Sequence, residues 1–210
     1  PVYSDDMTYD EKYAAATQAS LGFFEAAGYT VENGKVTAAP EGAKMTYEII
    51  IGADGSGDHP SFAILTDAKA ALESIGFTLE INDVTDSNIM WDGLNAGTAE
   101  MWAAAWQATV DPDMYQVYHS ASVKSNYYHI NDETLDQDII DARSTADQEY
   151  RKSVYKQCLD IILDWAVEIP IYQRQNCVIY SPERINADTF TKDVTTFYPW
   201  YGDIINIEMN

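Results

Sequence analysis

The chain has 210 residues, of which 46% are hydrophobic, and a formal net charge of -22 at pH 7. Such a length can bury a full hydrophobic core and favours one large domain or one domain with a smaller addition. No stretch approaches the roughly 18 uninterrupted apolar residues of a membrane-spanning helix. The negative charge would repel nucleic acids and anionic membrane surfaces, which argues against both as partners, although solubility alone explains the acidity more simply.

Two cysteines and the first residue bear on the origin of the chain. Cys158 falls on the apolar face of a predicted helix and Cys177 in a strand-like run, so we expect two small buried residues and no disulfide. No CxxC motif or Cys/His spacing indicates zinc. The chain begins at Pro1 with neither an initiating methionine nor a signal peptide, so we expect a mature piece or an excised fragment.

The first third of the chain predicts a helix, a hairpin and a strand. Thr8 and Glu11 have the spacing of a capping box, which opens a helix that runs to Ala27. Asn33-Gly34 is the dipeptide of a tight hairpin, because both positions tolerate a positive φ. Apolar residues then alternate with others over residues 45–51, which is typical of a strand.

The next segment predicts two β-α-β steps. A loop over residues 52–58 leads to a helix entered at Pro60, and the alternation of residues 77–81 predicts the next strand. This unit favours a parallel pair of strands with a right-handed crossover. A short helix over residues 87–95 and a strand that carries Trp102 and Trp106 imply one more such step.

The second half of the chain is predicted to be mainly helical. A short helix is expected from Met114 to His119, and Asn131 is expected to cap a helix that reaches Arg143. Thr145 and Gln148 repeat the capping-box spacing before the longest predicted helix. Extended runs follow over residues 167–172 and 177–180, and residues 181–210 show no pattern able to make a core of their own.

The aromatic and acidic segment of residues 100–118 is the candidate ligand site. Its apolar run, residues 101–106, suits a strand buried on both faces, and Asp111-Pro112-Asp113 should end that strand near Thr109. In a sheet with crossover helices, ligands usually bind at the carboxyl ends of the strands. Trp106 beside Gln107, Thr109 and Asp111 offers a stacking surface with hydrogen-bond donors and acceptors. Trp102 is expected to be a core residue.

Enzyme and phosphate-binding motifs are weak in this sequence. The three histidines stand far apart, and none lies in HExxH or beside a Gly-x-Ser-x-Gly elbow. Residues 55–57, Gly-Ser-Gly, lack the third glycine of GxGxxG and the ending of a P-loop, so we expect a turn into the following helix. A calcium loop using Asp54 and Asp58 lacks the regular ligand alternation and the closing glutamate. We therefore assign no catalytic residue, no metal ligand and no cofactor.

The order of these pieces resembles a known family. Leu72-Glu-Ser-Ile-Gly-Phe77, Trp106 with Asp111-Pro112, and the run from Trp165 to Tyr172 are its most specific parts, and the likeness extends from about Tyr9 to the end. The chain resembles the C-terminal lobe of family 5 extracellular solute-binding proteins, which deliver oligopeptides, dipeptides or nickel complexes to ABC importers. The resemblance implies an α/β, periplasmic-binding-protein-like type II lobe with β-α-β units and a mixed sheet flanked by helices.

The resemblance also implies a division of the chain and a set of ligand contacts. Residues 1–175 would form the C-terminal ligand-binding lobe, and residues 176–210 would return to an N-terminal lobe that lies outside this chain. Trp106 falls where the family places a tryptophan that borders the peptide. Three positions later, peptide binders commonly carry an aspartate that pairs with the ligand's amino terminus, but this sequence has Thr109. Asp111 would take over if the loop is one residue shorter, and Arg174 would suit an anionic group in the cleft.

These expectations define a non-catalytic receptor for an oligopeptide or similar solute, held outside the cell membrane by a lipid anchor or located in the periplasm. The ABC permease would be its protein partner, and the isolated chain would either self-associate or leave its last residues loosely packed. A hydrolase that uses Asp111 or His129 remains an alternative. So does a surface interaction module that binds through the aromatic run Phe197 to Tyr201.

Overall fold

The computed structural model describes residues 2–52, 55–107, 109–122, 125–173, 175–192, 194–195 and 197–210. The chain divides into two compact units, residues 1–107 and residues 108–210, and each is described by itself. The predicted division at residue 175 remains a prediction. None of the helices in the described ranges is both long and apolar enough to cross a bilayer.

The first unit opens with a helix and a hairpin, as predicted. Helix α1 (Tyr9–Ala26) begins with the complete capping box of Thr8 and Glu11, because each side chain satisfies a backbone N–H of the other. Strands β1 (Thr30–Glu32) and β2 (Lys35–Ala38) pair antiparallel around Asn33 and Gly34, whose φ angles are +52° and +73°. α1 and the hairpin share a small core with the turn that precedes the fourth strand.

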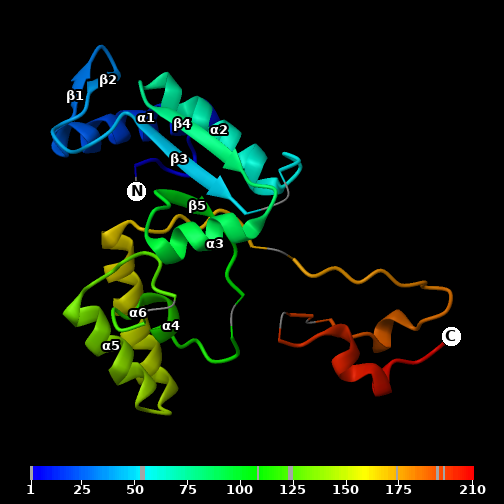
Figure 1. Cartoon of the computed structure of the whole chain (residues 1–210). Helices are drawn as coiled ribbons and strands as arrows, with labels where there is room; N and C mark the ends of the chain where they lie inside the picture. Colours follow the sequence, from blue (N-terminus) through cyan, green and yellow to red (C-terminus); the bar gives the residue numbers. More distant parts are fainter. Residues whose placement is uncertain are drawn as a thin grey trace. The chain divides into compact units, whose positions relative to one another are not determined.

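A three-stranded parallel sheet forms the centre of the first unit (Figure 1). Its order is β4-β3-β5, formed by β3 (Thr46–Ile51), β4 (Thr78–Asp83) and β5 (Met101–Ala103). The register pairs Ile51 of β3 with Asp83 of β4 and with Ala103 of β5. The carboxyl ends of all three strands therefore lie at one edge of the sheet.

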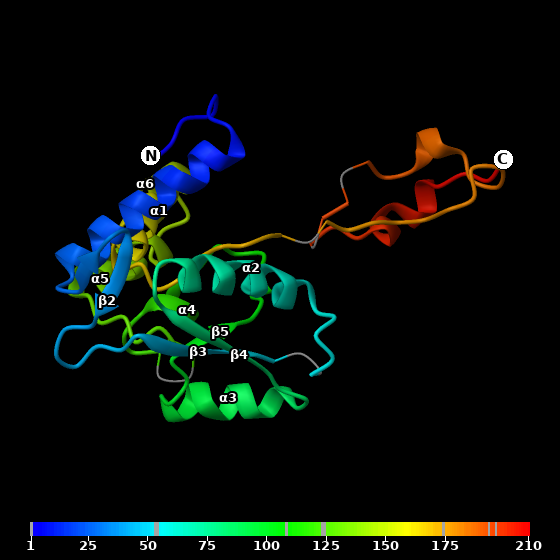
Figure 2. The ribbon, with the colours of Figure 1, turned by 90° about the horizontal axis from the view of Figure 1, so that it is seen from above.

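Helices α2 (Pro60–Ser74) and α3 (Ser87–Ala96) cover opposite faces of this sheet (Figure 2). On the α2 face, alternate residues of β3 pack with Leu65 of α2 and Leu79 of β4. Pro60 occupies the first turn of α2, and Gly97 ends α3 in the left-handed conformation. Both predicted β-α-β steps are thus confirmed, and the fold is α/β.

β5 is shorter and more exposed than expected. The prediction of a strand buried on both faces over residues 101–106 is wrong, because only three residues pair with β3 and none of them is buried. β5 stands at the end of the sheet order, so it has a strand partner on one side only. The two tryptophans of the run therefore lie on a short edge strand and on the segment that leaves it.

The second unit contains a helical pair. The helices α4 (Tyr115–Tyr118), α5 (Glu133–Arg143) and α6 (Gln148–Trp165) follow in order, and α5 packs on α6. Their core contains eight buried side chains. Among these, Leu135 and Ile139 of α5 and Cys158 of α6 have no exposed surface. This core is local to the helical pair and to the segment that precedes it.

The predicted caps of α5 and α6 are wrong by one or two residues. Asp132 caps α5 in place of Asn131, and its carboxylate accepts from the N–H groups of Thr134 (2.9 Å) and Leu135 (3.0 Å). Asp147 caps α6 in the same way, whereas the Thr145 hydroxyl lies two residues too early and accepts from the N–H of Asp147. A carboxylate at the cap also complements the helix dipole, which a hydroxyl or an amide does not.

The C-terminal segment has little regular structure. Its described residues form two 3-10 helices, η1 (Ala187–Thr189) and η2 (Trp200–Asn206), and an isolated antiparallel bridge between Ile185 and Met209. No residue after Ile162 is buried among those described, in agreement with the predicted lack of a core in the tail. Cys177 is exposed, so the prediction that it is buried is wrong, and both cysteines are free thiols.

Candidate functional site

The candidate site begins at the carboxyl edge of the parallel sheet. Ala103 ends β5, and the chain continues through two exposed alanines to Trp106 and Gln107, which close the first unit. The Trp106 side chain is 44% exposed, whereas Trp102 on β5 is half-buried. An indole that is anchored at one side and accessible at the other provides an apolar surface for a planar or extended ligand.

The backbone N–H donors of the glycine-rich loop at the same edge are already bound by a side chain of the sheet. The Asp83 carboxylate at the end of β4 accepts from the N–H of Gly55 (3.3 Å) and from the N–H of Gly57 (2.9 Å). An anionic ligand would need these donors, but the carboxylate already holds them. The prediction of a turn into α2 rather than a phosphate cradle is confirmed, and Asp54 of the suggested calcium loop lies outside the described residues.

Thr109 and Asp111 open the second unit, and the structure brings them together. The Thr109 hydroxyl donates to the backbone carbonyl of Asp111 at 2.6 Å. The Asp111 carboxylate is paired with Arg151 of α6, whose Nη2 lies 2.5 Å from Oδ1. Asp111 therefore sits in an ion pair, although 60% of its side chain is exposed.

Arg151 is held at that position by a buried aromatic residue. Its Nη2 also lies 3.4 Å from the hydroxyl of Tyr155, and the guanidinium carbon is 5.6 Å from the centre of the Tyr155 ring. The hydrogen bond with Asp111, followed by that with Tyr155, raises the pKa of Arg151 above its usual value. Only 19% of the Arg151 side chain is exposed.

Asp113 forms a second ion pair, similar to that of Asp111. Its carboxylate accepts from the N–H of Tyr115 at 3.0 Å and forms an ion pair with Arg143, whose Nε lies 3.1 Å from Oδ2. Arg143 ends α5, and its guanidinium carbon lies 4.4 Å from the centre of the Tyr115 ring, within the range of a cation–π contact. The bend of residues 109–113, here called the acidic bend, is thus joined to α5 and α6 by one arginine from each.

Sequence reasoning did not identify Arg143 and Arg151. A signal was present, because the chain has only four arginines against 34 acidic residues, and two of them flank the junction of the two long predicted helices. Which carboxylates they meet depends on separations of 30 and 40 residues along the chain. Arg174, which we expected to face the cleft, lies outside the described residues.

A histidine, a serine and an aspartate meet after α4, but not as a nucleophile and its base. The Ser120 hydroxyl donates to the Asp136 carboxylate, and Nδ1 of His119 lies 3.5 Å from the same carboxylate. Nδ1 of His119 accepts from the N–H of Ala121 at 3.0 Å, so the ring is not arranged to take a proton from Ser120. Nearby, Tyr118 donates to Glu168 at 2.7 Å, and burial followed by this bond raises the pKa of Tyr118.

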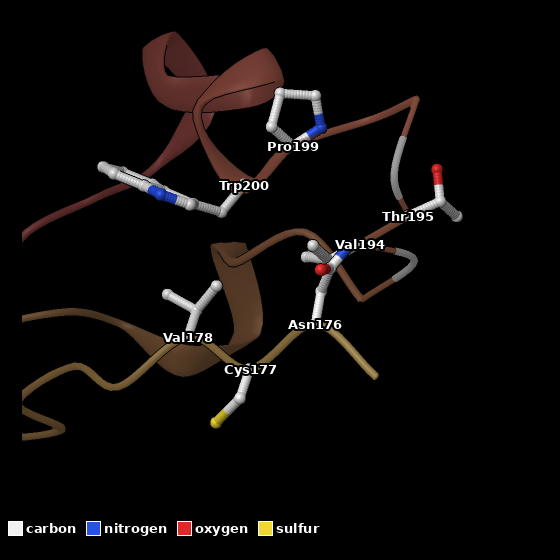
Figure 3. A pocket seen from close by; sticks show the side chains of 7 residues that line it. All are labelled: Asn176, Cys177, Val178, Val194, Thr195, Pro199 and Trp200. Atoms are coloured by element: carbon white, nitrogen blue, oxygen red, sulfur yellow. The ribbon is translucent and has the colours of Figure 1, made fainter. Parts of the chain in front are cut away.

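Among the described residues of the second unit, two sets line open hollows. One, of about 300 Å³, is lined by residues of the C-terminal segment, and Figure 3 shows Val178 and Cys177 on opposite sides of the extended chain there. The other, of about 500 Å³, is lined by Ser120, Ser122, Asn126, His129, Ile130 and Asn131. His129, the residue of the hydrolase alternative, is exposed and has a φ of +56°. In the described ranges, no group of three or more His, Cys, Asp or Glu residues could hold a metal ion.

Comparisons with known proteins identify the fold. No protein-family model matches the chain, and neither does any curated protein sequence. Among solved structures, the chain is similar to the oligopeptide-binding protein AppA from Bacillus subtilis in complex with a nonapeptide, with a TM-score of 0.56 and 17% identity over 79% of this chain and 32% of that one. It is also similar to NikA from Brucella suis in complex with Fe(III)-EDTA, with a TM-score of 0.56 and 18% identity over 79% and 34%.

A third solved structure agrees with these two. The periplasmic binding protein DppA from Helicobacter pylori, in complex with the peptide STSA, gives a TM-score of 0.54 and 20% identity over 79% of this chain and 30% of that one. The chain therefore spans about a third of the length of the solved structures it matches. About four-fifths of the chain therefore shares its α/β fold with a part of these binding proteins.

Proposed function

We propose that this chain is the C-terminal, ligand-binding lobe of a peptide-type receptor of an ABC importer. The observation that carries this proposal is the likeness of about four-fifths of the chain to substrate-binding proteins whose structures hold a nonapeptide, the peptide STSA or a chelated metal. The proposed role is to bind a solute without catalysing a reaction. The solute enters a cleft between this lobe and an N-terminal one, the lobes close, and the loaded receptor docks on the permease. Such a receptor works on the outer side of the membrane, in the periplasm or on a lipid anchor.

The exposed apolar side chains of the C-terminal segment support the proposal that a second lobe covers them. Large apolar side chains are exposed along it, including Ile179 (93%), Ile205 (90%) and Tyr201 (59%). A chain that covers such residues only in part buries too little apolar surface to hold itself in place. We propose that residues 176–210 pack against the N-terminal lobe of the same protein, and that a chain without that lobe self-associates through them.

Trp106 is the proposed centre of the ligand contact in this lobe, and Gln107 follows it directly in the sequence. Thr109, Asp111 and Arg174 are the other proposed contact residues. Its 44% exposure leaves an accessible area of about 110 Å², taking about 250 Å² for a whole tryptophan. Covering that area contributes up to about 2.7 kcal/mol at about 25 cal/mol per Å². Since every 1.4 kcal/mol corresponds to about tenfold in affinity, loss of the indole should weaken binding by up to about 100-fold.

The test is isothermal titration calorimetry of the complete gene product with peptides and with chelated nickel. Trp106→Ala is expected to weaken binding by between ten- and 100-fold, whereas Trp106→Phe, which keeps an aromatic face, should lose less than tenfold. Phe23→Ala is the control, because Phe23 is an exposed aromatic residue (73%) on α1, outside the proposed site and outside the C-terminal segment. Unchanged affinity in Trp106→Ala would remove Trp106 from the site, and failure to bind any of these solutes would refute the receptor role.

A further inference from the structure

The acidic bend carries no net charge once its partners are counted. Asp111 and Asp113 are its two carboxylates, and Arg151 and Arg143 supply one guanidinium to each. Two negative and two positive charges cancel. The bend that the sequence presents as acidic is therefore a set of two ion pairs on the surface of the second unit.

Asp111 cannot leave Arg151 without cost. The Arg151 side chain is 19% exposed, and its Nε is buried with no hydrogen-bond partner among the described residues. Besides Asp111, its hydrogen-bond partner there is the neutral hydroxyl of Tyr155. Removing Asp111 would leave a largely desolvated positive charge without compensation. An ammonium group that approached the exposed side of Asp111 would also lie close to that guanidinium, and the two like charges would repel each other.

The Asp113 carboxylate is less exposed than that of Asp111 and has both a backbone N–H and an arginine as partners. The Asp113 side chain is 29% exposed, accepts from a backbone N–H and is ion-paired with Arg143, which itself lies over the ring of Tyr115. Thr109 directs its hydroxyl to the carbonyl of Asp111 and brings no charge. Each side chain of the bend that could hold a cation is thus already bound within the unit.

We propose that Arg151 and Arg143 neutralise the acidic bend, so that the bend receives a ligand end that bears no ammonium group, such as a blocked amino terminus or a neutral amide. This inference rests on the proposed receptor function and names its substrate class. Arg151 is then a residue that determines specificity without touching the ligand. Its removal should free Asp111 to attract an amine, because a charge-assisted hydrogen bond needs an uncompensated carboxylate.

The experiment compares two forms of one peptide pool. The complete gene product is incubated with an equimolar mixture of nonapeptides with free amino termini and the same pool after N-acetylation with an isotope label, and mass spectrometry measures the ratio in the retained fraction. The wild-type protein should not favour the free amines over the acetylated form by more than about threefold, and Asp111→Asn should leave this ratio unchanged within twofold. Arg151→Gln should shift the ratio three- to tenfold toward the free amines.

Three controls assign the shift to the released carboxylate. The double variant Arg151→Gln/Asp111→Asn should return to the wild-type ratio, and Arg151→Lys, which keeps the positive charge, should stay near it. Arg184→Gln, which changes an exposed arginine outside the bend, should have no effect. Circular dichroism establishes that each variant is folded, and the wild type and Asp111→Asn alone decide the question if Arg151→Gln does not fold.

The outcomes separate this inference from the function on which it rests. A wild-type preference of more than threefold for free amines overturns the inference and leaves the receptor role standing. An Arg151→Gln variant that is folded and retains the wild-type ratio would also overturn the inference and leave the receptor role standing. If the wild type retains neither form of the pool, the peptide-receptor role fails, and the inference fails with it.

Discussion

At Gly76 the turn before β4 lies close against β2, and substitution of Gly76 tests this packing. Its φ is +104°, and a Cβ atom added there would lie 2.2 Å from the carbonyl oxygen of Val36 and 3.3 Å from its carbonyl carbon. Val36 is 2% exposed, and its N–H donates to the carbonyl of Ile75 at 2.7 Å. Gly76→Ala must therefore displace backbone that is buried and hydrogen-bonded, not the end of a flexible side chain.

The expected loss of stability has two parts. An alanine at a positive φ costs about 1–2 kcal/mol, and forcing the hairpin away from the turn adds about 1–3 kcal/mol, as other overpacked sites do. Gly76→Ala should thus lower the free energy of unfolding by about 2–5 kcal/mol. Gly42→Ala is the matched control, because Gly42 has a φ of +84° but no atom within 4 Å of an added Cβ, so only the first part applies.

Urea unfolding followed by circular dichroism measures both variants, and amide hydrogen exchange at Val36 reports the site directly. The Val36 amide should lose protection in Gly76→Ala and retain it in Gly42→Ala, since its partner Ile75 adjoins the clash. Equal destabilisation by the two substitutions, with Val36 protected in both, would refute the argument that β2 packs directly on this turn.

The remaining predictions concern the second unit. Leu135→Ala removes a side chain with 0% exposure from the α5/α6 core and should lower the free energy of unfolding by about 2–5 kcal/mol. Ile140→Ala on the same helix, where the side chain is 38% exposed, should cost clearly less in the same denaturation assay, and equal losses would contradict the assigned core. Burial raises the pKa of Cys158 to about 11, so its reactive thiolate is scarce at pH 8 while exposed Cys177 is accessible. A thiol reagent should therefore label one equivalent in the folded protein and two in denaturant, and Cys177→Ser should abolish the native reaction; rapid labelling of Cys158 in that variant would contradict the burial.

Much of the fold could be read from local pattern. The capping box of Thr8 and Glu11, the hairpin at Asn33-Gly34 and the first residue of α2 at Pro60 all occur where the sequence predicts them. These features depend on residues a few positions apart, whose backbone preferences act in any context. The errors at the caps of α5 and α6 also extend over only one or two residues. Several neighbouring polar residues can cap each helix, and in both helices an aspartate does so.

The candidate site was predictable only in part. The sequence places Trp106 at the exit of a strand, and the structure shows an exposed indole after β5, but the strand is half as long as expected and is not buried. Burial on both faces requires neighbours on both sides, and a run of apolar residues does not say how many strands a sheet has. The exposure of Cys177 follows the same logic, since its strand-like run finds no strand to pair with among the described residues.

By itself, therefore, the sequence determined the order of the elements, the parallel β-α-β units and the position of an aromatic residue before an acidic bend. Only the tertiary structure decided what that bend presents to a ligand, because its charge is set by Arg143 and Arg151, which lie 30 and 40 residues further along the chain. Local periodicity carries no information on such pairs. They form when α5 and α6 pack on each other and bring their ends to the bend, so the electrostatic character of the site is a property of the folded unit.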